Sequence, residues 1–98
     1  MTLETMRDHF EYYRNYYADA IRKVVEHAQE DSEDCRNDET VLQMYLDDVE
    51  HTGLMFMGML QLARSCNIIS IPEYGKYLDE MLAYAHDAYK AIEDIANN

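Results

Sequence analysis

The chain has 98 residues and a formal net charge of −12, with 20 Asp and Glu against 8 Lys and Arg. This length fits a single domain over residues 1–98 with a small core, so we expect oligomerisation as a source of additional stability. A phosphate backbone would repel such an acidic chain, which argues against direct nucleic-acid binding, whereas a basic protein surface would attract it.

The first predicted element is a helix over about residues 3–30, with Thr2 as its N-cap. Its apolar positions are spaced alternately by three and four residues, which is the seam of a coiled-coil-like helix. The seam consists of Leu3, Met6, Phe10, Tyr13, Tyr17, Ala20, Val24 and His27. Residues 31–37 are polar and have no apolar period, so we expect a loop there.

The second predicted helix covers about residues 39–66 and begins after a cap at Asn37 or Asp38. Within it, no side chain from Gly53 to Leu60 is polar, and such a run requires burial on every side. A second apolar stripe predicts that this is a middle helix with a neighbour on each side. That stripe consists of Met44, Met55 and Leu62.

The third predicted helix begins at the capping box Ser70-Ile71-Pro72-Glu73 and covers about residues 71–96. Short connections make consecutive helices antiparallel. The fold class we predict is therefore all-α, with three long antiparallel helices in an up-down-up bundle that is able to oligomerise.

In such a bundle the acidic residues gather at one end. Residues 26–50 carry a net charge of −9 and residues 87–98 a net charge of −2, and both segments fall at the same end of the bundle. The interpretation without a binding function is a solvated end that aids solubility. The functional interpretation is a docking surface for a basic partner, and its candidate residues are Glu30, Asp31, Glu33, Asp34, Asp38, Glu39, Asp47 and Asp48.

A second surface feature is the run Tyr12-Tyr13-Arg14-Asn15-Tyr16-Tyr17. Tyr12 and Tyr16 are four residues apart and form a ridge beside the seam. A wide core stripe would account for them, and so would a protein interface, where Tyr is enriched. We therefore name Tyr12 and Tyr16 as candidates for a self-interface or a second contact.

His51 and His86 fall at similar heights in the bundle, and Asp48 precedes His51 by three residues. These three residues are the metal candidates, although di-iron bundles require two Glu-x-x-His motifs and two further Glu, which this chain lacks. His51-Thr52-Gly53 followed by Gly58 resembles the phosphoacceptor helix of histidine phosphotransfer domains. Leu54 and Met55 stand where that family has its lysine, so we do not assign the chain to it.

We predict no cofactor and no enzymatic activity, since neither Cys35 nor Cys66 has a convincing histidine partner. The two cysteines lie too far apart for a disulfide and indicate a reducing compartment. There is no apolar signal segment near the N-terminus, and the run at 53–60 is too short to span a membrane, so we expect a cytoplasmic protein.

The leading hypothesis is a small non-enzymatic inhibitor that docks its acidic end onto a basic, nucleic-acid-handling protein. Phage anti-defence proteins, directed against CRISPR or restriction systems, are of this size and charge. The alternatives are a structural or regulatory homo-oligomer, such as a homodimer with a tyrosine-rich interface, and a metal or small-ligand binder using His51 and His86.

Overall fold

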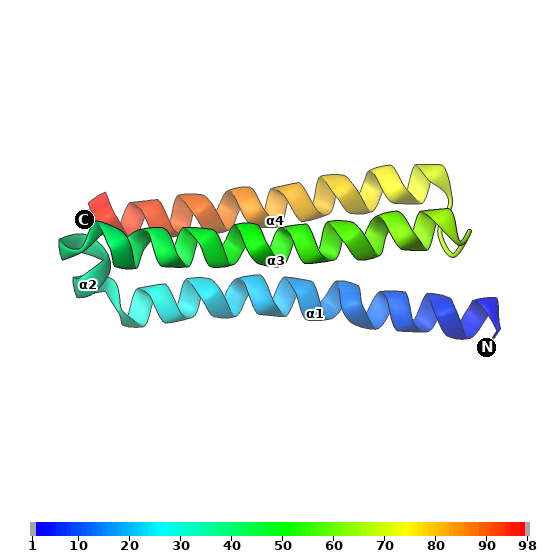
Figure 1. Ribbon diagram of the computed structural model, residues 1–98, viewed down its shortest axis with the longest axis horizontal. Helices are drawn as coiled ribbons and strands as arrows, with labels where there is room; N and C mark the ends of the chain where they lie inside the picture. Colours follow the sequence, from blue (N-terminus) through cyan, green and yellow to red (C-terminus); the bar gives the residue numbers. More distant parts are fainter. Residues whose placement is uncertain (1, 98) are drawn as a thin grey trace.

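The structure is a computed structural model that describes residues 2–97. It consists of α1 (Leu3–Glu30), α2 (Ser32–Asn37), α3 (Glu39–Ser65) and α4 (Ile71–Asn97), with no strand among the described residues. The all-α prediction is confirmed, but the number of helices is four and not three. Figure 1 shows the three long helices side by side along a rod of 50 × 21 × 16 Å, with α2 at the end where the chain finishes.

The short helix α2 corrects the prediction of a loop over residues 31–37. Glu33 and Asp34 lie in its first turn and Arg36 in its last, which suits the helix dipole at both ends. Its one buried side chain is Cys35, and the helix contacts α3 and α4. A single apolar residue produces no periodicity, so the sequence pattern carried no signal for this element.

Local capping interactions define where the long helices begin. Thr2 accepts a hydrogen bond from the Thr5 amide at 3.2 Å, and Asp38 accepts one from the Thr40 amide at 2.9 Å. Ser70 and Glu73 form the reciprocal capping box, with backbone-to-side-chain distances of 2.9 and 3.2 Å. These observations confirm the predicted caps.

A left-handed residue ends α3. Asn67 has a φ of 58° just after the helix, and the amide of Ile68 donates to the Ala63 carbonyl at 2.9 Å. Asn tolerates this conformation better than other non-glycine residues, so it reverses the chain toward α4.

Aromatic rings from all three long helices form the middle of the core. Tyr17 of α1 stacks on Phe56 of α3 with ring centroids 4.7 Å apart, and Phe10 lies 5.1 Å from Tyr77 of α4. The Tyr17 hydroxyl donates to the Met81 carbonyl at 3.2 Å, so the buried phenol is satisfied. Among the described residues, every fully buried side chain belongs to an apolar or aromatic residue or to Cys35.

The run from Gly53 to Leu60 is only half enclosed, which contradicts the prediction of burial on every side. Phe56 and Leu60 are buried, whereas Leu54 and Met55 are 58% and 64% exposed. The second stripe of Met44, Met55 and Leu62 is exposed as well. The reason is that α1 and α4 contact each other as well as α3, so both neighbours share one broad face of α3.

Candidate functional site

The acidic residues singled out in the sequence lie around the end of the rod that carries α2. Figure 1 places the last turn of α1, the whole of α2, the start of α3 and the end of α4 at this end. We call the eight candidate carboxylates there the acidic end. Seven of them are exposed and Asp31 is half-buried: Glu30, Asp31, Glu33, Asp34, Asp38, Glu39, Asp47 and Asp48.

Three members of the acidic end also hold the local structure together. Asp31 accepts a hydrogen bond from the Tyr45 hydroxyl at 3.1 Å, and Asp38 caps α3. Asp47 accepts a bond from the Gln43 side chain at 2.8 Å. The role of Asp31 depends on a side chain that the fold brings within reach, whereas the Gln43–Asp47 bond joins residues four apart on one helix, a spacing that the sequence already contained.

Like charges crowd one another at α2. The side chains of Asp34 and Asp31 lie close enough to share a proton, and this contact, with repulsion from Asp31, Glu33 and Asp38, raises the pKa of Asp34. Beneath this cluster, burial raises the pKa of the Cys35 thiol, and Asp31 and Asp34 add to the effect. The fold therefore holds carboxylates close together at an electrostatic cost.

The ion pairs of the described residues lie away from the acidic end. Arg7 pairs with Glu73 at 2.7 Å, and Arg14 pairs with Glu80 at 2.7 Å and with Glu11 at 3.0 Å. Farther along α1, Arg22 and Lys23 pair with Asp19, and Arg22 also reaches Glu26. Within residues 30–50, no described carboxylate has an ion-pair partner, so its charge is available to an external cation.

A second surface lies between α1 and α3 and contains two adjoining hollows. One hollow, of about 270 Å³, is lined by Tyr13 and Tyr16 from α1 and by Met55 and Met59 from α3, among others. The other, of about 210 Å³, shares Tyr13 and Met59 with the first and adds Leu62. We call Tyr12, Tyr13, Tyr16, Met55, Met59 and Leu62 the α1–α3 face.

The structure places both tyrosine candidates on this face. Tyr12 and Tyr16 are 65% and 63% exposed, and the Tyr12 ring meets Tyr13 edge-on at 5.6 Å. Sequence reasoning missed the contribution of α3, since Met55 and Leu62 were expected to be covered by a neighbour. The exposed apolar side chains of two helices therefore join into one patch.

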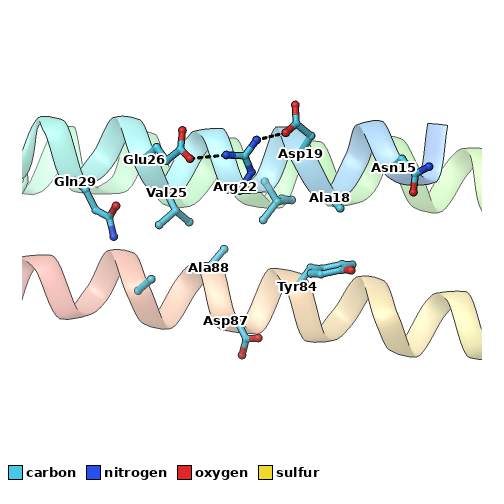
Figure 2. A pocket seen from close by; sticks show the side chains of 12 residues that line it. Asn15, Ala18, Asp19, Arg22, Val25, Glu26, Gln29, Tyr84, Asp87 and Ala88 are labelled. Carbon is cyan, nitrogen blue, oxygen red and sulfur yellow. Dashed lines mark hydrogen bonds and ion pairs between the residues drawn. The ribbon is translucent and has the colours of Figure 1, made fainter. Parts of the chain in front are cut away.

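A third hollow, of about 720 Å³, runs between α1 and α4 (Figure 2). Small side chains such as Ala18 and Ala88 leave the space, and Figure 2 shows Arg22 bridging Glu26 and Asp19 along the α1 rim. Asp87 lies on the α4 side. The charged side chains that α1 contributes to this cleft are paired with one another, whereas Asp87 of α4 has no ion-pair partner among the described residues.

The metal candidates are not gathered into a site. His51, His86 and Asp48 are all exposed, and residues 2–97 contain no group of three or more His, Cys, Asp or Glu side chains able to hold a metal ion. His51 lies two residues before the run from Gly53 to Leu60 and is exposed. Leu54 and Met55 still stand where histidine phosphotransfer domains have a lysine, so the chain is not assigned to that family.

Comparisons with protein-family models, with curated proteins and with solved structures find no match. No helix among the described residues is sufficiently long and apolar to cross a membrane. Two surfaces of the protein are therefore the candidates for function: the acidic end and the α1–α3 face.

Proposed function

We propose that this protein is a non-enzymatic protein-binding module whose acidic end docks onto a basic surface of another protein. One observation carries the proposal: exposed carboxylates without ion-pair partners gather at one end of the rod, while the ion pairs of the described residues lie elsewhere. Arg and Lys side chains of a partner would supply the missing counter-charges through charge-assisted hydrogen bonds.

The electrostatic state of α2 supports this proposal. The side-chain contact with Asp31, followed by repulsion from Asp31 and Glu33, raises the pKa of Asp34, so ionised Asp34 is held near other negative charges in the free protein. A cationic partner would relieve this repulsion, and part of the binding free energy would come from that relief. The partner would also be attracted over a distance, which speeds association at low salt.

The sharper form of the proposal is an inhibitor that occupies the nucleic-acid site of a basic protein, as anti-CRISPR or anti-restriction proteins of phages do. The supporting feature is the series of carboxylates along α2 and the first turn of α3, which offers negative charges in succession, as a phosphate backbone does. We further infer an up-down-up bundle, which the mutual contacts of α1, α3 and α4 support.

Two further inferences accompany the proposal. A cytoplasmic location suits two cysteines that form no disulfide with each other, one buried and one exposed. A non-enzymatic role suits the state of Cys35, because a buried thiol with a raised pKa is a weak nucleophile.

The proposal is tested by affinity capture with two charge-matched variants. One variant neutralises the acidic end with Glu30→Gln, Glu33→Gln and Asp34→Asn. The control neutralises three exposed carboxylates in the other half of the rod with Glu4→Gln, Asp8→Asn and Asp79→Asn. Both change the net charge equally, so a difference between them reports position and not overall charge.

We expect a partner recovered with the wild-type protein to be recovered equally well with the control variant. Its affinity for the acidic-end variant should fall by roughly 3- to 150-fold, since three exposed charge contacts of about 0.2–1 kcal/mol each sum to about 0.6–3 kcal/mol. Equal recovery with both variants would overturn the proposal.

The nucleic-acid-mimic form is tested by competition. Duplex and single-stranded DNA are titrated into the captured complex at constant ionic strength. Release of the partner by nucleic acid, and not by an equal concentration of uncharged polymer, is the expected result. A partner that binds nucleic acid and this protein simultaneously would contradict this form, while leaving the docking proposal intact.

A further inference from the structure

The α1–α3 face differs from the rest of the surface in its lack of formal charge. No Asp, Glu, Lys or Arg lines either of its two hollows, although the charged residues amount to 29% of the chain. The cleft between α1 and α4 shows the contrast, since Asp19, Arg22, Glu26 and Asp87 line it. A basic partner would find no carboxylate in these hollows. The α1–α3 face therefore requires an uncharged, apolar occupant.

The exposed apolar area on this face is sufficient for a small dimer interface. An aromatic side chain offers about 150–250 Å² when fully buried, so the exposed parts of Tyr12, Tyr13 and Tyr16 offer on the order of 350 Å² per copy. Met55 and Leu62 are 64% and 62% exposed and extend the patch along α3. Together these five side chains offer on the order of 500 Å² per copy, which is below the roughly 800 Å² of a standard interface and fits a weak dimer that forms as concentration rises.

The distribution of charge restricts how two copies can meet. A parallel pair would bring two acidic ends together, which a chain with a net charge of −12 opposes. An antiparallel pair would separate those ends along a rod 50 Å long, well beyond a screening length of about 8 Å at physiological salt. Each uncharged face would then meet another uncharged face.

We infer that the α1–α3 face binds a second copy of this chain in an antiparallel, two-fold symmetric dimer. Tyr13 and Met59 border both hollows, which places the two-fold axis near them and lets each copy set its Tyr16 ridge against the hollows of the other. Such an interface is self-complementary, as a two-fold axis requires. The acidic ends point away from each other and remain free. The inference is independent of the proposed function, and it would make the docking module divalent.

The first test measures mass against concentration by light scattering after gel filtration. The wild-type protein should change from monomer to twice the monomer mass as its concentration rises. Tyr16→Glu and Met55→Glu each place a charge on the exposed face and should keep the protein monomeric at concentrations where the wild type is dimeric. The control is Leu82→Glu, which changes a residue of α4 that is 52% exposed and lies outside the face.

All three variants alter exposed side chains, and circular dichroism would verify that each remains helical. A wild-type protein that stays monomeric at every concentration overturns the inference. A dimer that survives both Tyr16→Glu and Met55→Glu, or that is lost equally in Leu82→Glu, also overturns it.

The second test measures orientation with a spin label at the acidic end. Asn37→Cys is labelled in a Cys66→Ser background, since Cys66 is exposed whereas Cys35 is buried. With the axis near Met59, the helical rise of 1.5 Å per residue predicts roughly 60 Å between the two labels of an antiparallel dimer. A separation under roughly 30 Å would show a parallel pair and overturn the inference.

Salt separates failure of this inference from failure of the docking proposal. Added salt screens the repulsion between two acidic copies and leaves apolar burial intact, so the dimer should become tighter or stay unchanged. Docking of the acidic end onto a basic partner should weaken over the same range. A dimer that dissociates as salt rises would contradict an apolar interface.

Discussion

The hydroxyl of Tyr45 in α3 donates a hydrogen bond of 3.1 Å to the carboxylate of Asp31, which lies between α1 and α2. Burial and this contact with Asp31 raise the pKa of Tyr45, so the phenol remains a donor at neutral pH. The bond ties the start of α3 to the junction that holds α2. The Tyr45–Asp31 bond therefore helps to hold the carboxylates of the acidic end in fixed positions.

We predict that Tyr45→Phe lowers the free energy of unfolding by about 1 kcal/mol, because Asp31 loses its donor while the ring is kept. Urea denaturation followed by circular dichroism measures the change. Tyr12→Phe is the matched control, since the Tyr12 ring is exposed and its hydroxyl makes no hydrogen bond within residues 2–97. If both variants unfold at the same urea concentration as the wild type, the Tyr45–Asp31 bond does not stabilise the fold.

The two ends of the rod should respond to pH in opposite directions. At the α4 start, the hydrogen bond from Arg7 lowers the pKa of Glu73 from 4.5 to about 2. A carboxylate whose pKa is lower in the folded state stabilises the fold above its unfolded pKa, and this stability is lost as the pH falls from 4.5 toward 2. Glu73→Gln should therefore lower the free energy of unfolding at neutral pH. Between pH 4.5 and 2 the variant should lose less stability than the wild type does.

At the acidic end the sign is reversed. The pKa of Asp34 is raised above 3.8 by its contact with Asp31, so its contribution is most favourable below pH 3.8 and is lost as the pH rises through the folded value. Asp34→Asn should therefore increase stability at neutral pH and change little in acid. Thermal unfolding of the wild type and both variants across this range measures the effect, and parallel curves for all three would refute it.

The half-enclosed run of α3 leads to a prediction about two adjacent residues. Phe56 is buried between Phe10 and Tyr17, whereas Met55 faces outward on the α1–α3 face. Phe56→Ala should lower the free energy of unfolding by about 3–5 kcal/mol. In dilute solution, Met55→Ala should change it by no more than about 0.5 kcal/mol. Similar losses at both positions would mean that the run is enclosed on both sides.

Gly58 offers a stabilising substitution. A Cβ atom added at Gly58 would meet nothing within 4 Å, and the residue does not have a positive φ. Gly58→Ala should therefore raise the free energy of unfolding by about 0.5–1 kcal/mol, the usual difference within a helix. Chemical denaturation tests this. A loss of stability would show that another group approaches this turn closely.

Local signals made the helix ends predictable from sequence, and tertiary contacts explain what was missed. Thr2, Asp38 and the Ser70–Glu73 pair act on backbone within three residues of themselves, so the local sequence identified them. The α2 helix buries one cysteine and has no period to detect.

One of the two candidate surfaces was predictable from the sequence and the other was not. Acidic residues could be assigned to one end because the helix order follows from short connections. The exposure of Met55 and Leu62 could not be predicted, because an apolar residue does not indicate which neighbour covers it. In this fold α1 and α4 lie together on one face of α3 and leave the other uncovered.

The proposed binding of the acidic end to a basic partner is tested most directly by the affinity for a captured partner, measured against ionic strength. Three proteins are compared: the wild type, the variant neutralised at Glu30, Glu33 and Asp34, and the charge-matched control. We predict that affinity falls steeply with salt for the wild type and the control, and that the acidic-end variant binds more weakly and depends less on salt. Equal affinities and equal salt dependence for all three would contradict the claim.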